Sequence, residues 1–221
     1  MTLKPIQKTV TLKDQAYESI KQAIYSNTLL PGTPLTEEQL SSMLSISRTP
    51  IRSALQQLVF EKLATTDSTG HIFVSSVTHK DVEDITIMRM TLEPMALDMT
   101  SFPIFEGDLE VLESYYIQQY ELFNSSPDDN VIYQELDTKF HAALSALCGN
   151  KYLYETIQNI NNVMERINIL SGTLHENKRT ALQEHKAILD FIKNNQKEFA
   201  KVALTEHIKN VCSRMLPDDS I

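Results

Sequence analysis

Apolar residues recur every three or four positions along most of this chain, which is the spacing of one face of an α-helix. The first such stretch predicts a helix from Leu12 to Ser26, ended by the turn Leu30-Pro31-Gly32. A second helix is expected at Thr36-Glu37-Glu38-Gln39, because this segment has the form of a capping box in which Thr36 caps the helix and Gln39 reaches back. Met43 is expected on the apolar stripe of this second helix.

A third predicted helix begins after Ser47, which can cap it, and carries Pro50 in its first turn, where a missing N–H costs little. Arg48 and Arg52 are four residues apart and share the face opposite its apolar stripe. A guanidinium pair on an exposed helix can bind guanine edges or phosphates, whereas on an arbitrary helix it is more often a solvated surface. Ser47 and Thr49 are expected to add phosphate contacts at the helix N-terminus.

The helical spacing stops after residue 62. Short β-prone segments at 63–66 and 72–77 flank Asp67-Ser68-Thr69-Gly70, whose composition is typical of a hairpin turn. Three helices followed by a hairpin make a winged helix-turn-helix, and this context favours DNA contact over a solvated surface for the two arginines. Residues 1–76 are therefore expected to bind double-stranded operator DNA.

From residue 77 to residue 221 the chain is expected to be helical almost throughout. Proline and glycine residues divide this part into segments with helical spacing. The pattern predicts a mainly α protein, in which the winged domain is followed by an all-α six-helix bundle with helices at about 79–100, 106–124, 129–148, 151–171, 174–194 and 197–215.

The net charge of −9 by itself argues against DNA binding, but the charged residues are unevenly distributed between the two parts of the chain. Residues 1–76 hold 7 basic and 6 acidic side chains, whereas residues 77–221 hold 13 and 23. The nearly neutral N-terminal part can therefore approach the phosphates of DNA, while the acidic C-terminal part keeps the protein in solution. No apolar run is long enough to span a bilayer, and Met1-Thr2-Leu3-Lys4-Pro5 lacks the apolar core of a signal peptide, so we expect a cytoplasmic protein with no membrane partner.

Polar residues interrupt several apolar faces of the predicted bundle. Arg89, His185 and His207 each do so on a separate helix and are expected to point inward. Asp137 and His141 are four residues apart on one face of another helix, and such a pair can chelate a divalent ion. One inward histidine is most often a core residue bonded to a neighbour. Three histidines from three helices, with a carboxylate one turn from the first, favour a metal site.

Two other interpretations stay open at this point. In the first, the bundle is metal-free and the histidines line an apolar or fatty-acyl effector pocket. In the second, three imidazoles and open positions on a metal ion activate water in an enzyme. The sequence shows no further acid or base beside the candidate metal ligands that could take part in catalysis. An enzyme would also have no use for the winged helix-turn-helix. We therefore expect a regulator without catalytic residues.

The segment Ser47-Arg48-Thr49-Pro50-Ile51-Arg52-Ser53-Ala54-Leu55 resembles the GntR family of bacterial transcription regulators. Asp137, His141, His185 and His207 resemble the metal-binding set of its FCD subfamily, which is named for the C-terminal domain of FadR. The segment Arg89-x-x-x-Glu93 is similar to the same subfamily, and six sensor helices resemble its VanR-type branch.

This resemblance implies a ligand-responsive repressor that binds a palindromic operator as a homodimer. It also implies a Zn, Ni or Mn ion held by Asp137 and the three imidazoles, with open positions for a small carboxylate effector. Arg89 would hold the effector's acid group. Arg166 is a weaker candidate for the same role, and a salt bridge or a surface position is as good an interpretation.

Three features depart from the GntR pattern. The wing has His71 before Ile72-Phe73-Val74, with Gly70 one position earlier than in the family, and we expect minor-groove contact from Gly70 and His71. The recognition helix has Gln56-Gln57 where many relatives have arginine. Glu38 stands where some relatives place a phosphate-binding arginine. These departures predict a modest affinity for DNA or an unusual operator.

Overall fold

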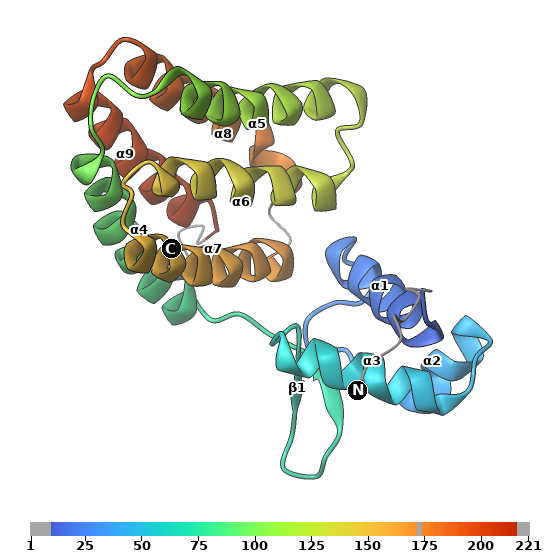
Figure 1. The fold of residues 1–221 in the computed structure, drawn as a ribbon. Coiled ribbons are helices and arrows are strands. Elements are labelled where there is room, and N and C mark those ends of the chain that lie inside the picture. The colour runs from blue at the N-terminus through green and yellow to red at the C-terminus, as the bar shows by residue number, and fades with distance from the viewer. Residues whose placement is uncertain (1–9, 172–173, 216–221) are drawn as a thin grey trace, which may run out of the picture. The chain divides into compact units, whose positions relative to one another are not determined.

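The computed structural model describes residues 10–171 and 174–215. The N-terminal residues on which the absence of a signal peptide was argued lie outside this range. The chain divides into two units, residues 1–76 and 77–221, which are drawn in Figure 1. The fold is mainly helical, and within the described residues its one sheet is a two-stranded hairpin, so the predicted fold class is confirmed.

Residues 10–76, the described part of the first unit, form three helices and the hairpin. An N-terminal capping box between Thr11 and Asp14 starts the first helix, because each side chain bonds the backbone N–H of the other residue. Ile24 of the first helix and Ile51 and Leu58 of the third are almost fully buried, so these two helices form the core of the unit. The elements are α1 (Leu12–Tyr25), α2 (Glu37–Leu44), α3 (Arg48–Phe60), β1 (Ala64–Thr66) and β2 (Ile72–Val74).

Details of the helix-turn-helix differ from the sequence expectations. Met43 is 73% exposed and takes no part in the core. The Thr36 side chain accepts a bond from the Gln39 backbone, but the Gln39 side chain bonds the Thr36 hydroxyl and not the Thr36 backbone. Ser47 occupies the N-cap position of α3 without a side-chain cap bond. Pro50 stands three residues later and has no N–H, which removes one of the two donors that a cap uses.

The wing is shorter than predicted. β1 and β2 are antiparallel, with Ala64 opposite Val74 and Thr66 opposite Ile72, and the second strand ends at Val74 although the β-prone segment runs to Val77. Gly70 has φ +88° in the turn between the strands, a region that glycine adopts without steric cost.

The described residues of the second unit form six helices, as the pattern predicted. α8 packs against α9, α4 packs against α7 and α9, and α6 packs between α5 and α7. Within the described residues no helix is long and apolar enough to cross a membrane. The bounds of the six helices are α4 (His79–Met99), α5 (Glu106–Ser125), α6 (Asn130–Ala146), α7 (Lys151–Ser171), α8 (Leu174–Lys193) and α9 (Lys197–Met215).

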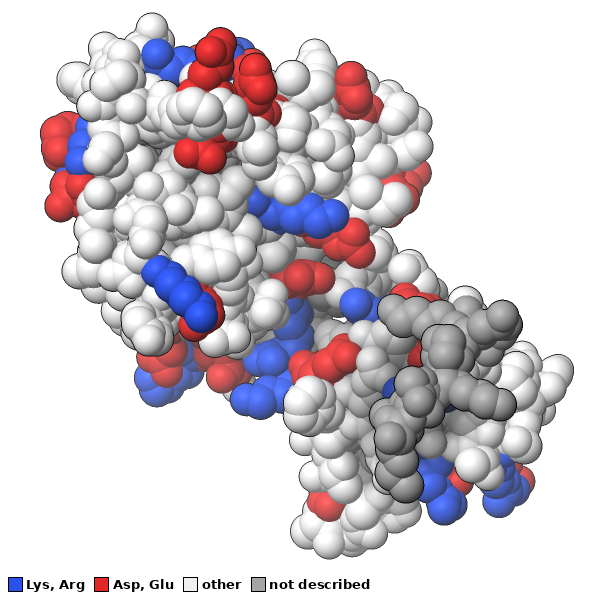
Figure 2. Space-filling view, viewed as in Figure 1, with Lys and Arg blue, Asp and Glu red and all other residues white. Residues whose placement is uncertain are grey.

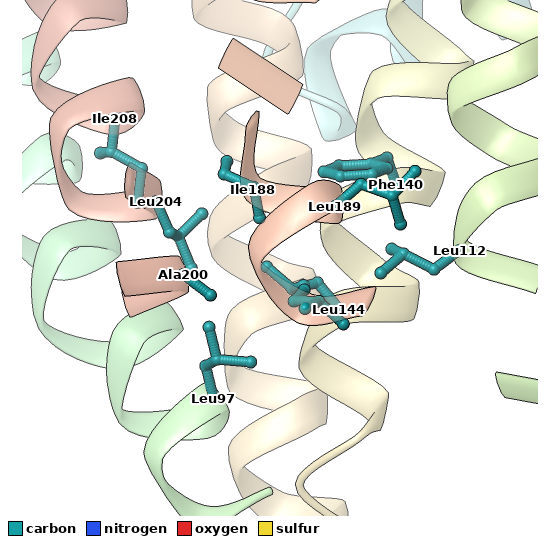
Figure 3. Packing of buried hydrophobic residues seen from close by; sticks show 10 residues of the cluster. Leu97, Leu112, Phe140, Leu144, Ile188, Leu189, Ala200, Leu204 and Ile208 are labelled. Atoms are coloured by element: carbon teal, nitrogen blue, oxygen red, sulfur yellow. The ribbon is translucent and has the colours of Figure 1, made fainter. Parts of the chain in front are cut away.

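The apolar core of the second unit lies where five of these helices meet. Figure 3 shows Leu97, Leu112 and Phe140 facing the leucines and isoleucines of α8 and α9. Each fully buried side chain of this kind stabilises the fold by about 1.5–3 kcal/mol. The ring of Phe140 also stacks on His185 with the ring centroids 4.4 Å apart, so the core directly supports one of the predicted site residues.

Candidate functional site

The imidazoles of three helices meet inside the second unit. His141 of α6, His185 of α8 and His207 of α9 are each at most 2% exposed. Nε2 of His207 lies 3.2 Å from Nε2 of His185 and 3.3 Å from Nε2 of His141. One nitrogen from each ring lies within 4.8 Å of the other two, which makes the three rings a candidate metal-binding group.

The second nitrogen of each ring is held by a group outside this cluster. Nδ1 of His141 lies 2.8 Å from Oε2 of Glu93, and Nδ1 of His207 lies 2.7 Å from Oε2 of Glu184. Nδ1 of His185 lies 3.0 Å from Oε1 of Gln119. An ionised carboxylate or an amide oxygen only accepts hydrogen bonds, so each Nδ1 must carry the proton. In neutral rings all three Nε2 atoms then present lone pairs to one another.

Lone pairs that face each other at this distance repel, so the arrangement calls for a cation between them. Protonation of the rings is opposed by burial, which lowers the pKa of His185 and of His207. A divalent metal ion has the right size, because nitrogens about 2.1 Å from a shared ion lie roughly 3.0–3.4 Å apart. Histidine ligands whose other nitrogen bonds a carboxylate or carbonyl oxygen are also the usual pattern at metal centres.

Asp137 lies at the edge of this cluster. Its Oδ1 is 3.5 Å from Nε2 of His185 and accepts a 3.4 Å hydrogen bond from the Gln119 amide. The group of mutually close ligand atoms among the described residues consists of the three histidines. The role of Asp137 as a fourth ligand therefore stays a prediction.

Two ion pairs, one buried and one partly buried, support the outer side of the imidazoles. Arg89 donates from Nε to Oε1 of Glu93 at 2.6 Å, and both residues are at most 3% exposed. Burial opposes the charge of Glu93, but Arg89 and His141 outweigh it and lower the pKa of Glu93 to about 2. Arg214 binds both carboxylate oxygens of Glu184 at 2.9 Å. Burial opposes this charge as well, and hydrogen bonds from His207 and Arg214 lower the pKa of Glu184 to about 2.

A cavity of about 40 Å³ lies beside the histidine cluster. Arg89, Asp137 and His207 belong both to its lining and to the site described above. Its wall is rich in hydrogen-bonding groups, and most of its charged members are cations. The further polar lining residues are Tyr133, Gln134, Asn168, Lys178 and Arg214.

Helix geometry places this cavity on one side of the histidines and the apolar core on the other. Gln134 and Lys178, both in the cavity wall, precede His141 and His185 by seven residues on their helices. The core residues Leu144 and Leu189 follow the same two histidines. Seven residues make about two helical turns, or roughly 10 Å. The histidines thus separate a dry core from a polar cavity.

Arg166 is not among the residues that line this cavity. It lies on α7, and its charge acts on Asp81 in the first turn of α4. The structure therefore brings Arg89 to the cavity and leaves Arg166 outside it.

The candidate DNA-binding residues lie in the first unit at the start of α3. Arg48 and Arg52 have 63% and 67% of their side chains exposed. Arg52 forms two hydrogen bonds to the Glu37 carboxylate of α2, at 2.7 and 3.0 Å, and Arg48 lies 3.7 Å from Glu38. Ser47 and Thr49 are also exposed beside them. DNA that contacts this face must compete with two carboxylates for the arginines.

The wing presents one further candidate contact. His71 is exposed, and its Nδ1 lies 2.7 Å from the Thr69 hydroxyl. The Asp67 carboxylate accepts bonds from the backbone N–H groups of Thr69 and His71 and so fixes the turn around Gly70. On the face drawn in Figure 2, acidic and basic side chains lie interspersed.

Sequence reasoning missed the groups that orient the histidines. Glu93 had a signal, since it stands one turn after Arg89 in the segment used for the family resemblance. Gln119 and Glu184 had none, because which side chains meet across helices depends on the packing of the helices. Lys178 lies in the polar stretch Glu176-Asn177-Lys178-Arg179, which is typical of a solvated helix end, yet it is only 2% exposed.

Comparison with known families gives two matches. The model described as "Bacterial regulatory proteins, gntR family" matches residues 12–74, and the FCD domain model matches residues 84–210. Together these matches cover both units of the chain.

Named relatives agree with these matches. The Bacillus subtilis protein YdhC, named as an uncharacterized HTH-type transcriptional regulator, is 29% identical over 91% of this chain and 89% of its own. The Escherichia coli HTH-type transcriptional repressor RspR is 22% identical over 93% of this chain and 90% of its own. A Rhodococcus sp. RHA1 structure, described as a GntR regulator, has a TM-score of 0.73 at 20% identity and covers 92% of this chain and 97% of its own, which shows a shared fold.

Proposed function

This chain belongs to the gntR family of bacterial regulatory proteins and carries an FCD domain, and from this membership we propose a repressor whose C-terminal unit binds a divalent metal ion and a small carboxylate effector. The matched families and named relatives are transcriptional regulators and not enzymes. The relative RspR is named a transcriptional repressor, which supports repression as the direction of regulation.

We assign operator binding to the first unit. The N-terminal turn of α3 presents Arg48, Thr49 and Arg52 on an exposed face, as a recognition helix in a major groove requires. Glu37 holds the Arg52 guanidinium through two hydrogen bonds, and DNA must take Arg52 from this carboxylate when it binds. Gly70 and His71 at the tip of the wing are the groups available to the adjacent minor groove.

The observation that carries the metal proposal is the meeting of three Nε2 lone pairs in a buried cluster. His141, His185 and His207 would hold the ion, with Asp137 as the carboxylate nearest to them. Three imidazoles and one carboxylate suit Zn, Ni or Mn. When bound, the ion supplies a positive charge and open coordination positions to the cavity. Glu93, Gln119 and Glu184 fix the rings in the required tautomer.

The cavity wall next to the cluster supports an acidic effector. Arg89 engages Glu93 through Nε, and no described residue accepts a bond from its two terminal nitrogens. Those nitrogens form the planar fork that binds a carboxylate in bidentate fashion. We therefore assign Arg89 to the effector's acid group and leave Arg166 out of the site.

A homodimer is the assembly that fits a palindromic operator. The apolar side chains on the outer face of α4 support it: Met88, Met95 and Met99 share one face by their spacing, and each is at least 44% exposed. We assign this face to the contact with a second copy of the chain. Multi-angle light scattering of wild type and of Met95→Glu tests it, since the variant is expected to elute as a monomer.

Elemental analysis of freshly purified, untagged protein tests the metal proposal. We expect about one equivalent of a transition metal per chain, lost in His185→Ala, because a site with one ligand missing competes poorly with buffer. His79→Ala, which removes a histidine at the start of α4, serves as the control and is expected to keep the metal. Metal below about a tenth of an equivalent, with no uptake on dialysis against Zn, Ni or Mn, would leave the metal-free effector pocket as the correct reading.

A further inference from the structure

Lys178 is a buried cation at the end of the cavity that lies away from the histidines. It is 2% exposed and belongs to the cavity wall. Its Nζ donates a 2.5 Å hydrogen bond to the Pro127 carbonyl and lies 5.0 Å from the centre of the Tyr133 ring. No carboxylate among the described residues forms an ion pair with it, although Asp128 and Asp129 lie close enough to act on its charge. A lysine buried in this way is expensive unless an anion compensates it.

The other charges of the cavity wall are already accounted for. Arg89 is paired with Glu93, and Arg214 is paired with Glu184. Among the lining residues this leaves the positive charge of Lys178, on which Asp128 and Asp129 act from outside the wall without an ion pair, and the negative charge of Asp137. The wall is therefore neutral without a metal ion and carries an excess of two positive charges once a divalent ion is bound beside Asp137.

These two positive charges lie at separate places. Lys178 precedes His185 by seven residues on α8, and Gln134 precedes His141 by seven residues on α6. Both intervals correspond to roughly 10 Å along a helix axis. Asn168 donates to the Gln134 side chain at 3.2 Å, so uncharged hydrogen-bonding groups lie at the same end of the cavity as Lys178. One compact acid group cannot neutralise both ends.

We propose that the effector is a small dianion with two separate acid groups, one at the metal and Arg89 and the other at Lys178. This inference rests on the proposed metal and carboxylate site. It also makes effector binding depend on the metal ion, because only the metal-loaded wall carries the matching excess charge. A small cavity and two charged ends together select short molecules with an acid group at each end.

Isothermal titration of the Zn-loaded full chain tests the proposal. The probes are the straight-chain dicarboxylates from malonate to suberate, each compared with the monocarboxylate of the same carbon number. We expect at least one dicarboxylate to bind about tenfold or more tighter than its partner. In Lys178→Met this ratio is expected to fall to about one, because the dicarboxylate loses the partner of its second acid group and the monocarboxylate has no second group to lose. Lys186→Met, which removes an exposed lysine from the same helix, is the matched control and is expected to keep the ratio.

The outcomes separate this proposal from the one on which it rests. If monocarboxylates bind in the presence of zinc and a second acid group does not raise the affinity, the dianion proposal is wrong and the proposed function still stands. A preference for dicarboxylates that survives in Lys178→Met would overturn the role of Lys178. Absence of binding by either series would overturn both proposals. If Lys178→Met does not fold, the affinity ratio measured in wild type still tests whether the effector is a dianion. Lys178→Arg keeps the positive charge and is expected to keep this ratio.

Discussion

At the scale of single residues, Glu184 shows how one side chain supports the whole site. It accepts hydrogen bonds from His207, Arg214 and Asn210, and these bonds keep its carboxylate ionised. In the proposed metal site this charge would make His207 a better ligand and would prevent the ring from turning its Nδ1 inward. The same function falls to Glu93 for His141.

Glu184→Gln is therefore expected to weaken metal binding by roughly 10- to 100-fold, the range known for groups that orient a ligand. The glutamine can still accept a bond from His207 but provides no charge. Competition against a chromophoric chelator measures the affinity. Glu206→Gln, an exposed neighbour of His207 on α9, is the control. Equal zinc affinity of Glu184→Gln and wild type would show that Glu184 has only a structural role.

Arg52 supplies the corresponding test in the DNA-binding unit. Arg52→Ala is expected to lower operator affinity by roughly tenfold or more if the guanidinium reads a base. Its side chain is exposed, so the melting temperature is expected to stay unchanged. Fluorescence anisotropy at matched salt concentration measures the affinity, and an unchanged value for the cognate operator would remove Arg52 from the interface.

Glu38→Gln is expected to act in the opposite direction. Glu38 lies 3.7 Å from Arg48 and stands on the face that we assign to DNA, where its charge repels phosphate and competes for the arginine. The variant is expected to bind both operator and unrelated DNA a few-fold more tightly, with the gain shrinking as salt rises. Glu18→Gln on α1 makes the same change of charge elsewhere in this unit. An equal gain in both variants would mean that only net charge matters.

At the scale of helices and strands, periodicity and capping predicted most of the architecture. The helices α1–α3 of the first unit and α4–α9 of the second lie within a few residues of their predicted bounds. Proline and glycine end a helix through their own backbone geometry, so the nearby sequence is enough to predict where it ends. The inward direction of Arg89, His185 and His207 followed from the same periodicity. The partners on other helices did not, since the pairing of Glu184 with Arg214 or of Lys178 with Pro127 depends on packing that no single helix encodes.

Removal of the metal ion is expected to loosen three helices selectively. The ion would connect α6, α8 and α9, so dialysis against a chelator is expected to lower the melting temperature of the bundle. Compared with protein at a metal concentration 100 times the Kd, the free energy of unfolding is expected to fall by about 2.7 kcal/mol. Hydrogen exchange resolved by peptide locates the effect. Faster exchange is expected near His141, His185 and His207, with no change in α1–α3. Exchange that rises equally in both units would contradict a local metal site.

At the scale of the whole molecule, the two units divide the work of a ligand-responsive regulator. The first unit presents the two arginines that we assign to DNA recognition and the wing, and the second holds the histidine cluster and the cavity. Family membership is clear from matches to both units, whereas the branch within the FCD regulators stays a prediction. The identity of the effector depends on the shape of the cavity, which sequence periodicity does not describe.

The central claim is that metal and effector in the second unit control DNA binding by the first. The most direct measurement is the affinity for an operator fragment, selected from DNA next to the gene, with and without zinc and a small carboxylate that binds. We predict that the carboxylate changes operator affinity at least fivefold in zinc-loaded wild type, a typical coupling between two sites, and leaves it unchanged in His185→Ala. An equal response in both proteins, or no response in the zinc-loaded wild type, would contradict the claim.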